Sequence, residues 1–133
     1  MTLNPLTIGS APEQARPLLE KAKKSYGFVP NLLAVMAHAP ATLEAYMTLS
    51  GLFDQTSLSP TERQVVLLAI SVENQCTYCV AAHTVIAQMQ KVDTDVVEAI
   101  RNGEPIQDGK LEALRRFAVE IVTTRDWPSD EVK

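Results

Sequence analysis

Residues 59–73 read SPTERQVVLLAISVE, and this stretch decides the fold. A hydroxyl side chain at Ser59, a proline at the first helical position and Glu62 three residues after the cap form a capping box, which is typical of a helix start. The segment 65–70 is apolar on all sides, so by periodicity alone it fits a buried strand as well as a helix. The cap and the overall length favour a helix over about 60–73 that lies in the core.

Helical signals also fill most of the remaining chain, and no alternating strand pattern competes with them. The expected elements are a helix over 12–25, a short helix from 32 to a break at 38–40, a longer helix ending near 53, a helix over 79–89, a helix capped by 93–95 and closed by 102–103, and a stripe over 111–122. The sequence therefore predicts an all-α fold, a compact helical domain of about six helices.

The composition limits the classes of partner. A chain of 133 residues fits one domain that folds without disulfide staples, and 46% hydrophobic with 21% charged residues indicate a packed core. The net charge of −4 and the scattered basic residues argue against a nucleic-acid partner. No apolar run spans a membrane and no leader pattern opens the sequence, so we expect a cytoplasmic protein without a membrane partner.

The end of the sequence predicts more chain than is present. Residues 127–131 have the pattern of a helix cap followed by an acidic first turn, yet the sequence stops at Lys133. We therefore expect residues 1–133 to be a single helical domain that is truncated at its C-terminus, with a partner chain covering the apolar surface left exposed.

Cys76, Cys79 and His83 form the pattern C-x-x-C-x-x-x-H, which carries the chemistry of this sequence. On a helix, Cys79 and His83 are four residues apart and share a face, with Cys76 one turn before. A thiolate is the reactive form of cysteine, and a helix N-terminus or a neighbouring histidine activates it. A second thiol one turn away resolves an oxidised first thiol as a disulfide, which an external reductant then opens. The pattern predicts thiol–disulfide redox chemistry.

These residues carry a family resemblance. The stretch from Leu58 to His83, LSPTERQVVLLAISVENQCTYCVAAH, resembles the core motif of the AhpD-like alkylhydroperoxidases, within the carboxymuconolactone decarboxylase family. The upstream segment YGFVPN, residues 26–31, is also similar, and the similar segments together cover roughly residues 17–125.

The resemblance implies an all-α fold, homo-oligomers that are trimers or hexamers, and reduction of small organic hydroperoxides at the expense of a reductant protein or a small thiol. It implies that Cys79 is the peroxidatic thiol, that Cys76 is the resolving thiol, and that His83 belongs to a proton relay that draws the proton from Cys79.

The sequence departs from the better-characterised members at two relay positions. Gln64 stands where they carry a glutamate, and Tyr78 stands where they carry a histidine between the cysteines. Glu73 is our candidate for the missing carboxylate, with Glu62 behind it. An ideal helix puts Glu73 roughly opposite Gln64, so the substitution requires the break at Asn74 to turn Glu73 toward the cysteines.

Other functions compete with the peroxidase hypothesis. The cysteines and His83 provide three zinc ligands, and His38 is the one other histidine, whereas a structural zinc site needs four ligands. A lactone decarboxylase is a second alternative, because the wider family contains such enzymes, but they characteristically work without a cysteine pair. The third is a non-enzymatic oligomeric scaffold. No sequence motif indicates a cofactor, and we favour redox chemistry over metal binding.

Overall fold

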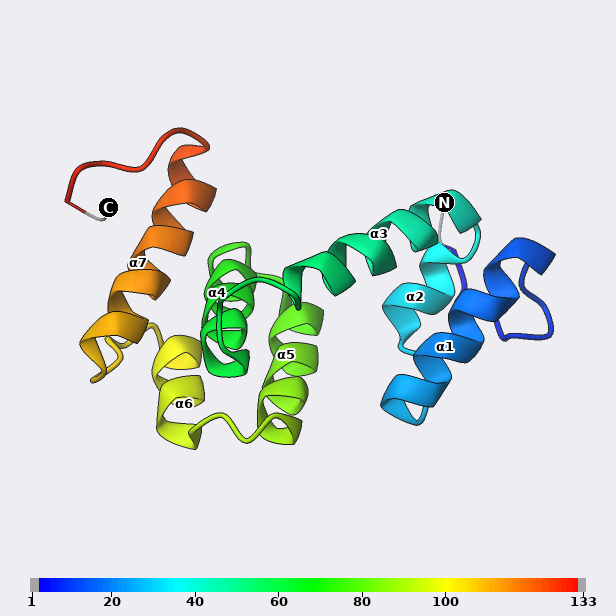
Figure 1. The fold of residues 1–133 in the computed structure, drawn as a ribbon, viewed down its shortest axis with the longest axis horizontal. Helices are drawn as coiled ribbons and strands as arrows, with labels where there is room; N and C mark the ends of the chain where they lie inside the picture. Colours follow the sequence, from blue (N-terminus) through cyan, green and yellow to red (C-terminus); the bar gives the residue numbers. More distant parts are fainter. Residues whose placement is uncertain (1–2, 132–133) are drawn as a thin grey trace. The chain divides into compact units, whose positions relative to one another are not determined.

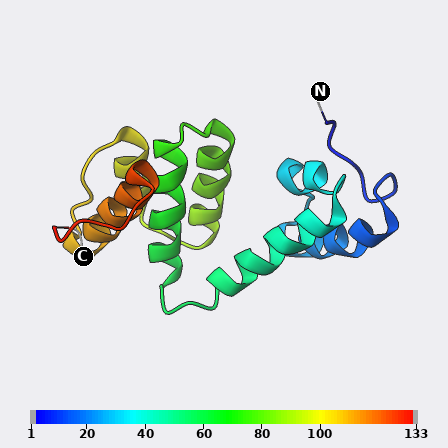
Figure 2. The same cartoon turned by 90° about the horizontal axis from the view of Figure 1, so that it is seen from above.

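The computed structural model describes residues 3–131. The chain forms two compact units that meet in the sequence between Thr56 and Ser57. The first contains the helices labelled α1 to α3 in Figure 1, and the second contains α4 to α7. Figure 2 shows the same helices, in the same colours, from above. The prediction of one domain over 1–133 remains a prediction.

The N-terminal unit is built from a 3₁₀ helix, Glu13–Ala15, and three α-helices. These are α1 (Arg16–Tyr26), α2 (Asn31–Met36) and α3 (Pro40–Phe53). Gly27 ends α1 in the left-handed conformation, which glycine adopts without strain. The core of this unit consists of small and aliphatic side chains: Ala11, Ala15, Leu19, Ala22, Leu33, Ala37 and Leu43.

The C-terminal unit is organised around a central helix, α4 (Pro60–Glu73). This helix contacts α5 (Thr77–Met89), α6 (Thr94–Asn102) and α7 (Gly109–Thr124), as Figure 1 shows. The core residues are Val65, Leu68, Ala69, Ala87, Val92, Val97, Ile100 and Ile106. Because α4 contacts every other helix of its unit, it fixes the position of α5, which carries the cysteines.

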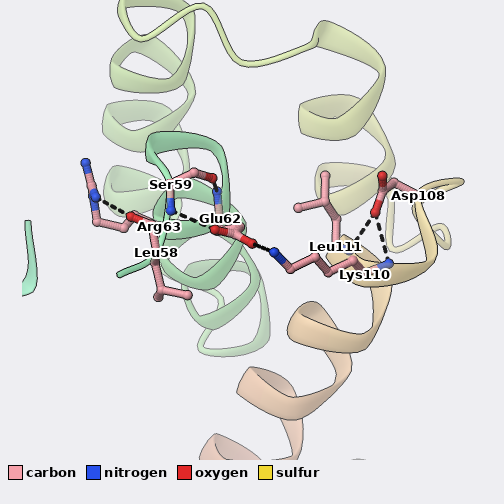
Figure 3. Close-up of polar contacts among 7 residues, drawn as sticks. All are labelled: Leu58, Ser59, Glu62, Arg63, Asp108, Lys110 and Leu111. Atoms are coloured by element: carbon pink, nitrogen blue, oxygen red, sulfur yellow. Dashed lines mark hydrogen bonds and ion pairs between the residues drawn. The ribbon is translucent and has the colours of Figure 1, made fainter. Parts of the chain in front are cut away.

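The start of α4 has the predicted capping box, which Figure 3 shows in detail. The Ser59 hydroxyl accepts a hydrogen bond from the Glu62 backbone N–H at 3.2 Å, and the Glu62 carboxylate accepts one from the Ser59 backbone N–H at 2.7 Å. The other carboxylate oxygen of Glu62 forms an ion pair of 2.6 Å with Lys110 at the start of α7. The Lys110 ammonium and then the Ser59 donors lower the pKa of Glu62 to about 2.

The helical fold agrees with the sequence prediction. The helices predicted between residues 12 and 122 are all present, and residues 3–131 contain seven α-helices, one more than the estimate of about six. Residues 127–131, which the sequence predicts to begin a further helix, form no helix. Several boundaries differ: α1 begins at Arg16 rather than near residue 12, α3 already begins at Pro40, and α5 begins at Thr77 rather than at Cys79. Proline fits the first turn of a helix because the N–H it lacks has no helical partner there. Within the described part of the chain, none of the helices combines the length and the hydropathy that a membrane crossing requires.

Candidate functional site

A tight connection between α4 and α5 places the first cysteine at a helix start. Asn74 ends α4, and Gln75 adopts a left-handed conformation with φ of 53°. Backbone hydrogen bonds from Gln75 N–H to the Val72 carbonyl and from Cys76 N–H to the Ser71 carbonyl, of 2.9 and 3.0 Å, hold the reversal. The chain therefore turns within three residues, and Cys76 opens α5.

Cys76 is the N-cap residue of α5, and its sulfur is bonded to the sulfur of Cys79. The Cα atoms of the two cysteines are 5.3 Å apart, and the Cys76 sulfur accepts a hydrogen bond from the Cys79 backbone N–H at 3.3 Å. Both residues are partly buried. The predicted proximity of the two sulfurs is confirmed, and the pair closes a disulfide within one helical turn.

The start of α5 also stabilises a negative charge on the sulfur of Cys76. Unpaired backbone N–H groups at a helix N-terminus stabilise a negative charge, by about 0.3–1 kcal/mol at an exposed site. A sulfur at the N-cap that already accepts one N–H is placed to gain from this effect as a thiolate. The reduced Cys76 is therefore suited to act as a nucleophile or as a leaving group.

His83 lies one helical turn after Cys79 on α5 and is partly buried. Its Nδ1 is 3.1 Å from Oε1 of Gln64, which comes from α4. Burial lowers the pKa of His83 below its ordinary value of 6.5, because an imidazolium loses more hydration than a neutral ring. His83 is thus kept in the neutral form, which can accept a proton.

Gln64 is 4% exposed, and both ends of its side-chain amide have partners. Oε1 faces His83, and Nε2 donates a hydrogen bond of 3.2 Å to Oε1 of Gln90 at the C-terminal end of α5. The position that differs from the better-characterised members therefore contacts the predicted relay histidine. It does so as a neutral amide and not as a carboxylate.

The two candidate relay carboxylates, Glu73 and Glu62, lie in surroundings that differ from those of His83. Glu73 is the exposed last residue of α4, and that helix continues unbroken to it, so no break turns it back toward the side of Gln64. A relay role for Glu73 stays a prediction. Glu62 is held by the capping box and by Lys110, on the contact of α4 with α7.

Tyr78 and His38 are both on the surface of their units. Tyr78 lies between the cysteines in the sequence and is 43% exposed. His38 is exposed in the N-terminal unit, where its Nε2 donates a hydrogen bond of 2.9 Å to the carbonyl of Asn4. Within residues 3–131, no group of three or more His, Cys, Asp or Glu side chains is arranged to hold a metal ion.

Sequence reasoning missed Gln90. The signal that would find it is helical spacing: Gln90 follows His83 by seven residues, two turns of α5, so the two side chains share a face. That spacing does not reveal the amide of Gln64 between them, because this contact depends on the packing of α4 against α5.

An open, mainly apolar pocket lies next to the helix start. Gln75 and Thr77, the sequence neighbours of Cys76, belong to its wall together with Arg101, which is paired with Glu98 at 2.7 Å. The full lining consists of Val72, Gln75, Thr77, Val80, Ala81 and Arg101. The lining includes neither cysteine nor His83.

The fold and the site define a class: an all-α protein with a disulfide-forming C-x-x-C pair at a helix start and a partly buried histidine one turn beyond it. Residues 40–120 match the model of the carboxymuconolactone decarboxylase family. Because the match spans more than half of the chain, the protein belongs to this family, and the resemblance found in the sequence is confirmed. No curated protein matches the chain.

Proposed function

We propose that this protein is a thiol-dependent peroxidase that reduces small hydroperoxides through Cys79 and Cys76. The observation that supports it most is the disulfide between these cysteines, with a neutral, partly buried His83 one helical turn after Cys79 on α5. Such a pair exchanges two electrons and two protons, which is what the reduction of one hydroperoxide to an alcohol and water requires.

In the first step, the Cys79 thiolate attacks the terminal oxygen of the hydroperoxide. The O–O bond breaks, the alkoxide takes a proton and leaves as the alcohol, and Cys79 becomes a sulfenic acid. His83 accepts the thiol proton of Cys79 and is the group that can return it to the alkoxide, because the two residues are one turn apart on α5.

In the second step, the Cys76 thiolate attacks the sulfenic sulfur of Cys79. The new S–S bond displaces hydroxide, which takes a proton and leaves as water. The N-cap position of Cys76 favours the thiolate that this attack needs. A dithiol protein or two small thiols then reduce the disulfide, and the proposal places this cycle in the cytoplasm, where such thiols are available.

Two single variants test the assignment. Cys79→Ser is expected to abolish peroxide-dependent sulfenate formation, whereas Cys76→Ser is expected to accumulate a sulfenate that a dimedone probe labels at Cys79. Mass spectrometry of the labelled peptide measures both. Unimpaired peroxide turnover in both variants contradicts the proposal.

A lactone decarboxylase is the second candidate, because the matched family bears the name of that activity. It predicts decarboxylation that survives replacement of both cysteines, and the peroxidase predicts that no activity survives this change. One double variant, Cys76→Ser with Cys79→Ser, assayed against a lactone acid and a hydroperoxide, distinguishes them.

We further propose that the chain assembles with copies of itself, as trimers or hexamers. One face of α5 carries the exposed apolar side chains of Tyr78, Val85 and Met89, which supports a contact between copies of the chain at this face. Sedimentation velocity on the full chain and on Val85→Glu tests it. We expect a fall in mass for the variant, and a monomeric parent protein contradicts the assembly.

A further inference from the structure

The mechanism above gives no part to Gln90, yet Gln90 is hydrogen-bonded to the site. It caps the C-terminal end of α5, is exposed, and accepts the Nε2–H of Gln64 on its own Oε1 at 3.2 Å. Gln64 in turn is buried, with its oxygen 3.1 Å from Nδ1 of His83. The three side chains form one chain of hydrogen bonds from the surface to the histidine.

The direction of these hydrogen bonds fixes where the proton of His83 sits. A side-chain amide has an acceptor at one end and a donor at the other. When Nε2 of Gln64 donates to Gln90, its oxygen faces the ring, and an oxygen can only accept. Nδ1 of His83 must then carry the hydrogen, which leaves Nε2 unprotonated.

The tautomer decides whether His83 is a base through Nε2. With the Gln64 amide reversed, its NH₂ group would face Nδ1, and the hydrogen of the neutral ring would move to Nε2. That nitrogen could not take a second proton. In the observed orientation, the imidazolium formed by proton uptake keeps its Nδ1–H donated to the same oxygen, so the site needs no rearrangement.

We propose that Gln90 is a positioning residue that acts through Gln64 to hold His83 in the tautomer with hydrogen on Nδ1. The catalytic consequence rests on the proposed peroxidase function, whereas the tautomer itself does not. Since burial keeps the ring neutral, the tautomer is the property left for the two amides to control.

Three substitutions of Gln90 distinguish a side chain that accepts a hydrogen bond from Gln64 from one that donates a hydrogen bond to it. Gln90→Glu only accepts and keeps the amide of Gln64 in place. Gln90→Lys only donates and draws the Gln64 oxygen toward itself, which turns the NH₂ group to His83. Gln90→Met neither accepts nor donates, at similar size. The same charges at Gln88, which is exposed on a different face of α5, serve as controls: Gln88→Glu and Gln88→Lys.

The readout is the ¹⁵N shift of both ring nitrogens of His83, measured by NMR in the disulfide form at a pH where the ring is neutral. We expect hydrogen on Nδ1 in the parent protein and in Gln90→Glu, a shift of population to Nε2 in Gln90→Lys, and intermediate values in Gln90→Met. The two Gln88 variants should match the parent. Equal ring shifts in all Gln90 variants overturn the inference.

Peroxide-dependent sulfenate formation is the second readout, on the same proteins. We expect Gln90→Lys to be slower than Gln90→Glu by about tenfold or more, since general base catalysis contributes about 10²–10⁴-fold. A tautomer change with no peroxide reaction in any protein, the parent included, supports the role of Gln90 and refutes the peroxidase. A tautomer change with equal peroxide rates refutes the catalytic consequence.

Discussion

Replacing Gln64 by glutamate should raise the pKa of His83 relative to the parent protein. The amide oxygen lies 3.1 Å from Nδ1, so a carboxylate there would put unit charges about 4 Å apart, which is worth about 4 kcal/mol at an effective dielectric constant of about 20. Burial of the carboxylate at a position that is 4% exposed opposes this gain. A net preference of about 1–3 kcal/mol for the imidazolium remains, which is roughly 5- to 150-fold in the protonation equilibrium.

An NMR titration of His83 in Gln64→Glu and in the parent protein measures this effect. Gln64→Met is the matched control, because it keeps the length of the side chain and removes both hydrogen-bonding groups. It should leave the pKa of His83 below the ordinary value of 6.5, since burial is what lowers it in the parent protein. A pKa in Gln64→Glu equal to or below the parent value would refute the contact between Gln64 and His83.

Three further predictions concern stability and rate. Leu68→Ala, at a side chain that is 1% exposed, should lower the free energy of urea unfolding by about 2–5 kcal/mol, whereas the same change at Leu52, which is 58% exposed, should alter it by about 0.5 kcal/mol or less. The pKa of Glu62 is lowered from 4.5 to about 2, so its contribution to stability is complete above pH 4.5 and is lost as the pH falls toward 2. The free energy of unfolding should therefore depend less steeply on pH in Glu62→Gln than in the parent protein across this range. Equal slopes in the two proteins would contradict the ion pair with Lys110. His83→Gln should slow sulfenate formation by about 10²-fold or more, and an unchanged rate would exclude His83 as the base.

Local signals explain why the sequence predicts the fold well. The capping box at Ser59 and Glu62, the left-handed Gly103 that ends α6, and the Asp93 cap that opens it each act within a few residues of the chain. The start of α5 lacks such a signal, because its N-cap is Cys76, whose sulfur replaces the usual oxygen acceptor.

The site was predictable only where it lies on one helix. Cys76, Cys79 and His83 follow one another on α5, so their spacing alone brings them together. The contact of His83 with Gln64 joins two helices, and its partner is the neutral residue that the sequence marked as a departure from the better-characterised members. Glu73 is a candidate by its charge and its nearness in sequence, neither of which fixes the direction of a side chain at the end of a helix.

The most direct test of the proposed peroxidase activity compares the amount of disulfide formed with the amount of alcohol released in a single turnover. The protein is reduced, freed of reductant and given one equivalent of an organic hydroperoxide; intact-mass and peptide analysis then measure the bond between Cys76 and Cys79, and chromatography measures the alcohol. We predict one disulfide within one chain for each alcohol formed. Reduced cysteines beside consumed peroxide, or intact peroxide after full incubation, would contradict it.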